Sequence, residues 1–199
     1  MMEFLGMEKV KDGKYLKNYE LTYLNKAGRE KKYEIVSRSE ITGPDALGKR
    51  VSGVSIVAYH EDRLLLLREF RMGVNRYIYN LCAGMIEEGE SMEECITREL
   101  YEETGLRLTP IPGGCCSRPF FTTVGMTDES CGTVFGRCEG EPTSIHQEAT
   151  EEIQVVLADK AECRRILREE NVAVQCAYML MHFIASEGDP FRFLDSRQE

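Results

Sequence analysis

Three glutamates at helical spacing are the residues of this sequence best suited to chemistry. If their segment is a helix, Glu103 and Glu102 lie about 40° and 60° to either side of Glu99. Carboxylates crowded in this way repel, at a cost of roughly 0.2–0.5 kcal/mol per pair on an exposed helix. A divalent cation would offset this repulsion, because hard cations prefer oxygen ligands. The alternative is a solvated acidic face in which Arg98 pairs with Glu102.

The segment that positions these glutamates carries the start and stop signals of a helix. Ser91 and Glu94 have the spacing of a capping box, and Gly105 is a C-terminal stop. An apolar stripe at helical spacing supplies the buried face, from Met92, Cys95, Ile96 and Leu100. The sequence therefore predicts a helix over residues 91–104.

The same stretch resembles the Nudix box over residues 84–106. The box reads G-x5-E-x7-R-E-U-x-E-E-x-G-U, where U is apolar, and every fixed position matches. The fixed positions are Gly84, Glu90, Arg98, Glu99, Glu102, Glu103 and Gly105. With ordinary residue frequencies, a chance match somewhere in such a chain is on the order of one in ten million. The chain is thus identified as a Nudix hydrolase by resemblance.

This resemblance implies a fold, a metal and a role for each box residue. The fold would be an α/β/α sandwich with a mixed sheet, here with a small N-terminal β-sheet extension. Mg²⁺ or Mn²⁺ would be held by Glu99, Glu102, Glu103 and the carbonyl group of Ala83, and Glu102 and Glu103 would take part in catalysis. The ion would polarise a water and neutralise charge on pyrophosphate oxygens. The site would be supported by Gly84, Glu90, Arg98 and Gly105.

Two segments before the box resemble the ADP-ribose pyrophosphatase branch of the family. Arg68-Glu-Phe-Arg71 matches a Tyr/Phe-Arg segment, and Tyr33-Glu-Ile-Val-Ser-Arg38 matches a Trp-Glu-x-Val-x-Arg segment. By this resemblance, substrate contacts would come from Arg38, Arg71, Met85 and Gly125. For each arginine, the alternative is a surface salt bridge.

Three positions depart from that branch. Cys82 stands where proline is usual, Tyr33 where tryptophan is usual, and Asn80 where glutamate is common. These differences leave the predicted chemistry intact and the choice of substrate open.

In the same branch, a glutamate on a later loop activates the attacking water. The matching stretch here contains Glu148, Glu151 and Glu152. We favour Glu151 by its distance from Ile153, with Glu148 next. A solvated loop residue is the alternative for each of them.

The length of 199 residues suits one well-filled domain with an appendage. We assign residues 1–49 to an N-terminal β extension, which the resemblance implies is exchanged in a homodimer, and residues 50–199 to the Nudix hydrolase domain. Alternation and turn residues predict a hairpin within 15–39, with its turn at Asn25–Gly28. Further strands are predicted near 51–59, 63–70, 77–81, 118–123, 132–138 and 153–157, with helices near 160–168 and 171–186.

Composition excludes several classes of function. A net charge of −9 disfavours a nucleic-acid partner, although a metal-bearing acidic site remains compatible with phosphate substrates. No apolar stretch is long enough for a signal peptide or a membrane span. The eight cysteines show no CxxC spacing, so we expect reduced thiols in a cytoplasmic protein.

Together these observations predict hydrolysis of the pyrophosphate of ADP-ribose, or a related nucleotide sugar, to AMP and a sugar phosphate. The partner would be a small molecule linked to a nucleoside diphosphate. Two alternatives stay open. One is another Nudix substrate, such as GDP-mannose or a dinucleoside polyphosphate, and the other is a Nudix-like ligand sensor that does not cleave.

Overall fold

A computed structural model describes residues 1–116 and 118–194 of the chain. These residues form two compact units. Unit 1 comprises Met1–Ser52 and Arg118–Cys131, and unit 2 comprises the other described residues, 53–116 and 132–194. A segment far from the N-terminus in sequence therefore belongs to the same unit as the N-terminal strands.

Unit 1 contains a three-stranded antiparallel sheet in the order β1-β2-β3. Its strands are β1 (Glu3–Asp12), β2 (Lys17–Leu24) and β3 (Glu30–Ser37). The predicted hairpin is confirmed. The Asn25 side chain accepts hydrogen bonds from the backbone N–H groups of Ala27 and Arg29, and Gly28 adopts a left-handed φ of 71°. Strand β1 was not predicted, because this edge strand is mostly exposed and lacks a clear apolar alternation.

The core of unit 1 lies against one face of this sheet. It consists of Tyr19, Leu21, Ile35 and Ile41, which are each less than 9% exposed. A short 3-10 helix, η1 (Pro44–Ala46), follows β3, and Leu47 beyond it packs on this cluster. Strand β9 (Phe120–Phe121) pairs with Ser130 and Cys131 at the start of β10 (Ser130–Glu139).

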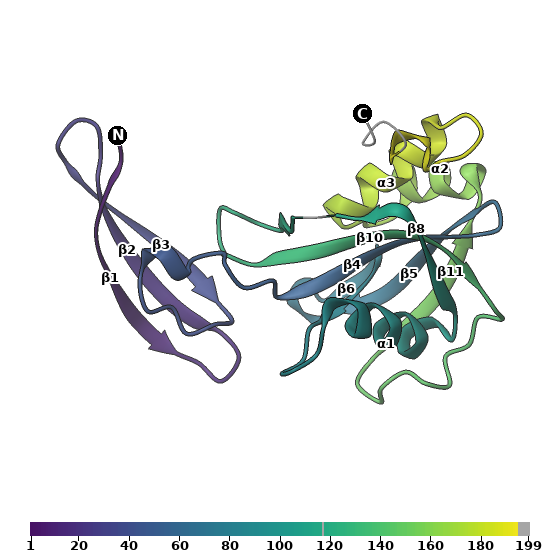
Figure 1. Ribbon diagram of the computed structural model, residues 1–199, viewed down its shortest axis with the longest axis horizontal. Coiled ribbons are helices and arrows are strands. Elements are labelled where there is room, and N and C mark those ends of the chain that lie inside the picture. The colour runs from purple at the N-terminus through teal and green to yellow at the C-terminus, as the bar shows by residue number, and fades with distance from the viewer. Residues whose placement is uncertain (117, 195–199) are drawn as a thin grey trace. The chain divides into compact units, whose positions relative to one another are not determined.

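Unit 2 is built on a mixed sheet with strand order β11-β5-β4-β10-β8, in which β6 pairs with β5 and β7 with β4. The strands are β4 (Gly53–His60), β5 (Arg63–Arg71), β6 (Arg76–Asn80), β7 (Cys82–Met85), β8 (Arg107–Cys115) and β11 (Ile153–Ala158). Helix α1 (Met92–Thr104) covers one face of this sheet, and α2 (Lys160–Glu169) and α3 (Val174–Ala185) cover the other (Figure 1). The predicted α/β/α sandwich is confirmed.

Strand β5 shows why the sheet needs helices on both faces. Leu64 and Leu66 pack in the cluster that includes α2 and α3, whereas Leu65 and Leu67 pack in the cluster that includes α1. All four side chains are at most 1% exposed. Each such burial stabilises the fold by roughly 1.5–3 kcal/mol relative to an exposed leucine. The continuous apolar run is therefore the signature of a strand buried on both sides.

Strand β8 was missed, and the strand predicted near 118–123 shrinks to the two residues of β9. Pro110, Pro112 and the pair Gly113-Gly114 make the β8 segment read as a loop. The strand tolerates them because it lies at the end of the strand order, where proline removes fewer ladder hydrogen bonds. Its pairing with β10 also contains a register shift between Val134 and Gly136.

Among the helices in the described part of the chain, none is both long and apolar enough to cross a membrane.

Candidate metal and catalytic site

Helix α1 has the predicted ends. The Ser91 side chain accepts a hydrogen bond from the Glu94 N–H, and the Glu94 carboxylate accepts one from the Ser91 N–H. Gly105 ends the helix with a φ of 74°. Cys95, Ile96 and Leu100 are buried beneath the helix, which confirms the predicted apolar stripe. These signals fix the rotation of α1 and hence the direction in which its glutamates point.

Gly84 on β7 makes room for one of these glutamates. A Cβ atom at this position would lie 1.8 Å from the carboxyl carbon of Glu99. Because a glycine has no side chain, the Glu99 carboxyl group can lie directly against the backbone of β7. The presence of a glycine at the start of the box thus has a steric explanation.

Arg98 binds three glutamates of the box. Its Nε and Nη2 donate to the two carboxylate oxygens of Glu90 at 2.7 and 2.9 Å, and its Nη1 donates to Glu99 at 2.9 Å and Glu102 at 3.1 Å. Nη2 also donates to the carbonyl oxygen of Met85 at 3.1 Å. Arg98 and the backbone N–H of Glu87 lower the pKa of Glu90 to about 2. Glu90 is therefore an ionised anchor for the arginine.

Glu103 is the most unusual member of the group. It is 5% exposed, and its Oε2 has no hydrogen-bond partner among the described residues. Burial raises its pKa to about 8, the facing Cys82 thiol opposes this rise, and the charges of Glu99, Glu69 and Glu151 add to it. A buried carboxylate oxygen without a partner is costly. A bound cation would supply the missing interaction.

Glu99 and Glu103 line a cavity of about 490 Å³ within unit 2. Its carboxylates come from Glu69, Glu99, Glu103, Glu148, Glu151 and Glu152. Arg71 is the one basic residue of the described lining, and the backbone at Ala83, Gly84 and Met85 forms another part of the wall. This surplus of negative charge and oxygen donors suits a hard divalent cation.

The carboxylates of the cavity do not converge on a single point where an ion could bind. Among the described residues, no three His, Cys, Asp or Glu side chains are gathered closely enough to hold a metal ion as they stand. Arg98 engages Glu99 and Glu102, and Glu102 is half-exposed outside the cavity lining. The residues fit a divalent ion by their chemistry and by the unpartnered oxygen of Glu103.

The loop before β11 brings the candidate water-activating residues to the same cavity. Glu148 and Glu151 both line it, and the Glu151 carboxylate accepts a hydrogen bond from the Glu148 N–H at 3.0 Å. Glu152, also in the lining, accepts a hydrogen bond from the Tyr77 hydroxyl. The assignment of Glu151 over Glu148 stays a prediction.

Two anchors of this loop were missed from the sequence. The Gln147 side chain donates to the backbone carbonyl of Glu103 at 2.8 Å, and the ring of His146 stacks on Tyr101 of α1 at a centroid distance of 4.4 Å. Neither residue belongs to a motif, so only the tertiary structure reveals that the loop is tied to the end of α1.

The four predicted substrate contacts are divided between the units. Arg71 and Met85 line the cavity of unit 2. Arg38 and Gly125 belong to unit 1, where Arg38 pairs with Glu129 at 3.0 Å and the Gly125 carbonyl accepts a hydrogen bond from the Tyr33 hydroxyl at 2.9 Å. Their contact with substrate stays a prediction.

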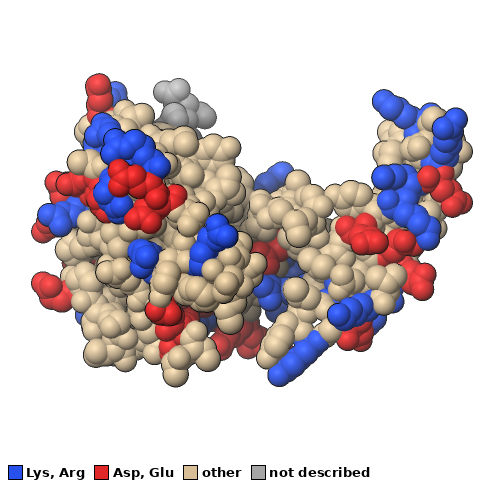
Figure 2. Space-filling model, turned by 180° about the vertical axis from the view of Figure 1, so that it is seen from behind, with Lys and Arg blue, Asp and Glu red and all other residues tan. Residues whose placement is uncertain are grey.

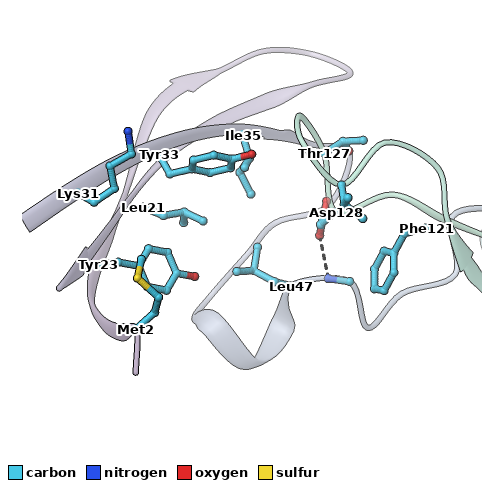
Figure 3. A pocket seen from close by; sticks show the side chains of 12 residues that line it. Met2, Leu21, Tyr23, Lys31, Tyr33, Ile35, Leu47, Phe121, Thr127 and Asp128 are labelled. Atoms are coloured by element: carbon cyan, nitrogen blue, oxygen red, sulfur yellow. Dashed lines mark hydrogen bonds between the residues drawn. The ribbon is translucent and has the colours of Figure 1, made fainter. Parts of the chain in front are cut away.

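Unit 1 has a pocket of its own, of about 560 Å³ (Figure 3). Its walls are mainly apolar and aromatic, with Tyr23, Tyr33 and Phe121 among them, and its charged lining residues are Lys31 and Asp128. Asp128 accepts a hydrogen bond from the Gly48 N–H at 3.2 Å. This pocket is slightly larger than the cavity of unit 2 but lacks its carboxylates. Chemistry, not size, therefore selects the cavity of unit 2 as the catalytic candidate.

Acidic and basic side chains are interspersed on the molecular face seen in Figure 2, without a continuous basic surface.

The chain belongs to the Nudix family. The family model described as the NUDIX domain matches residues 49–175, which include the whole carboxylate cavity. The fold itself is similar to that of a solved structure. A solved structure titled as an ADP compounds hydrolase superimposes with a TM-score of 0.65 and 21% sequence identity, covering 90% of each chain.

The chain is also similar to several curated proteins. The chain is 33% identical over 100 residues to an ADP-sugar pyrophosphatase of Mus musculus, covering 50% of this chain and 46% of that protein. It is 34% identical over 85 residues to the ADP-ribose pyrophosphatase of Bacillus subtilis, covering 41% and 43%. The match to a putative nudix hydrolase of Caenorhabditis elegans is 25% identical over 170 residues and covers 80% and 73%. The chain thus spans less than half the length of the first two relatives.

Proposed function

We propose that the chain is a metal-dependent pyrophosphohydrolase that cleaves ADP-ribose, or a related ADP-sugar, to AMP and a sugar phosphate. The observation that carries this proposal is the cavity rich in carboxylates, in which Glu99 lies beside Glu103 and its unpartnered oxygen Oε2. The substrate class is supported by the names of the mouse and Bacillus relatives and by the segments before the box.

Glu99, Glu103 and the carbonyl oxygen of Ala83 would hold Mg²⁺ or Mn²⁺, with Glu102 available once it leaves Arg98. The bound ion supplies charge neutralisation at the phosphate oxygens and acidifies a water. Glu151, or Glu148 beside it, would accept a proton from the attacking water. Arg71 would donate hydrogen bonds to the phosphates, as the cationic member of the described lining.

The proposal is tested by measuring AMP release from ADP-ribose, in parallel with GDP-mannose and a diadenosine polyphosphate, with and without Mg²⁺ and Mn²⁺. We expect metal-dependent release that prefers ADP-ribose, and a loss of more than about 100-fold in Glu103→Gln. A preference for another substrate would contradict the ADP-sugar assignment. Retained binding without cleavage would indicate a ligand sensor.

We further propose that the chain forms a homodimer through its N-terminal sheet and acts in the cytoplasm. The first part rests on the resemblance of residues 33–38 to a segment exchanged between subunits, and the second on the absence of CxxC spacing among the eight cysteines of the sequence. A dimeric mass is expected in light scattering at micromolar concentration. A monomeric mass would contradict the exchange.

A further inference from the structure

Glu69 is a buried carboxylate in the cavity wall to which neither the box nor the segment Arg68–Arg71 assigns a role. It lies near the end of β5 and is 7% exposed. Both carboxylate oxygens have a partner. Oε1 accepts a hydrogen bond from the Asn80 side chain at 2.9 Å, and Oε2 accepts one from the Arg71 guanidinium at 3.3 Å. Glu69 therefore joins a residue of β6 to the cationic residue of the cavity lining.

The sheet register explains this juxtaposition. Glu69 and Arg71 are two residues apart on β5, so their side chains leave the same face of the sheet. Glu69 is opposite Ile78 on β6, which makes Asn80 its diagonal neighbour on that face. The three side chains are thus held by two strands that are hydrogen-bonded to each other.

Arg71 needs such a partner in order to be oriented. Its side chain is 59% exposed, and a long exposed arginine must lose rotamer freedom before it can hold a ligand. Nη1 is engaged with Glu69, which leaves the other N–H groups for an anion in the cavity. The Arg71 guanidinium would also supply a phosphate with positive charge in a cavity otherwise lined by glutamates.

Asn80 can hold Glu69 in place because its side chain is an amide. An amide can donate to Glu69, whereas an ionised glutamate at this position would place two carboxylates against each other. The departure from the common glutamate noted at position 80 is therefore matched to the carboxylate at position 69.

We propose that Glu69, held by Asn80, is a positioning residue that orients Arg71 toward a phosphate of the bound nucleotide. This inference rests on the proposed function and deepens it. Arg71 would contact the substrate in the ground state and the transition state alike, so loss of its orientation raises KM with little change in kcat.

The test is a double-mutant cycle of Glu69→Gln and Arg71→Ala, measured as KM for ADP-ribose and as Kd for inorganic pyrophosphate with Mg²⁺. We expect Glu69→Gln to raise both constants about tenfold while kcat changes less than about twofold. In the Arg71→Ala background, the same substitution should change both constants less than about twofold. A tenfold effect that persists without Arg71, or an equal fall in kcat, would overturn the proposal.

Exchanging the carboxylate and the amide between positions 69 and 80 tests whether Glu69 orients Arg71 or only supports the fold. Asn80→Glu alone should lower the Tm, because it opposes two carboxylates. Combined with Glu69→Gln, it restores an amide–carboxylate pair, so the Tm should recover. KM should stay raised, because the residue beside Arg71 is then an amide. Recovery of KM together with the Tm would refute a role through Arg71.

The two readouts keep this proposal distinct from the proposed function. Wild-type protein that binds pyrophosphate but cleaves no substrate would contradict the hydrolase activity. The coupling between Glu69 and Arg71 would still be read from the Kd values, and additive effects there would overturn it.

Discussion

At the scale of single residues, the buried Glu103 links the stability of the fold to pH and to the proposed metal. Its carboxylate is buried with one unpartnered oxygen, and its pKa is raised to about 8. In the unfolded chain the same group titrates near 4.5. The proton on Glu103 therefore stabilises the metal-free fold fully below about pH 4.5, and this contribution is lost as the pH rises through about 8.

This titration predicts a pH-dependent effect of Glu103→Gln, because glutamine resembles the protonated acid. In the presence of a chelator, the variant should match the wild-type Tm near pH 5 and exceed it at pH 9. Added Mn²⁺ should raise the Tm of the wild type and leave that of the variant nearly unchanged. Thermal unfolding followed by circular dichroism measures both effects. A Tm difference independent of pH would contradict the assigned titration.

At the scale of secondary structure elements, β7 and α1 meet at Gly84 and Glu99. Strand β7 has no side chain at this point, so the helix can bring a carboxylate onto its backbone. The contact also sets which part of the carboxylate stays open to the cavity. Strand and helix thus together form the wall of the cavity in which we propose that the metal binds.

This contact predicts that Gly84→Ala damages the site more than the fold. The new methyl group overlaps the Glu99 carboxyl group, which is the mobile end of a side chain and can swing away. We expect the Tm to stay within a few degrees of the wild type, which corresponds to a change of about 1 kcal/mol in the free energy of unfolding. The rise in Tm that Mn²⁺ induces should be lost. Gly6→Ala is the matched control, because a Cβ atom there meets no atom within 4 Å. A normal metal response in Gly84→Ala would refute this account.

Elements and site were predictable from the sequence to different extents. Helix α1 carries its own start, stop and apolar stripe, and β5 its continuous leucines, so both could be predicted locally. Strand β8 could not, because its prolines and glycines are acceptable only at its place in the sheet. Likewise, the box locates Glu99 and Glu103, whereas the contact of Glu69 with Asn80 depends on a cross-strand register that spacing does not encode.

At the scale of the whole molecule, the cysteines differ in their exposure to solvent. Cys115 is exposed, whereas six others are buried and Cys131 is intermediate. Burial raises the pKa of Cys95, Cys163 and Cys176 to about 12. These thiols are core residues in the folded protein and are poor nucleophiles at neutral pH.

This division predicts the order of thiol modification. An aromatic disulfide reagent at pH 8 should modify Cys115 first, and the buried thiols should react only when the protein unfolds. Cys115→Ser should remove the fast phase of the absorbance change and leave the slow phase intact. A fast phase that survives in this variant would contradict the prediction, because it would show that a second thiol is accessible in the folded protein.

Strand β5 holds the centre of the core with Leu64–Leu67 and then continues into Glu69 and Arg71. The segment that we propose recognises the ligand is therefore also the segment that holds the core together, so a substitution in this strand can affect both stability and binding. The loop that carries Glu148 and Glu151 is exposed, and it contacts α1 through Gln147 and His146. Substrate preference should accordingly diversify among descendants through insertions and replacements in that loop, while β5 changes slowly.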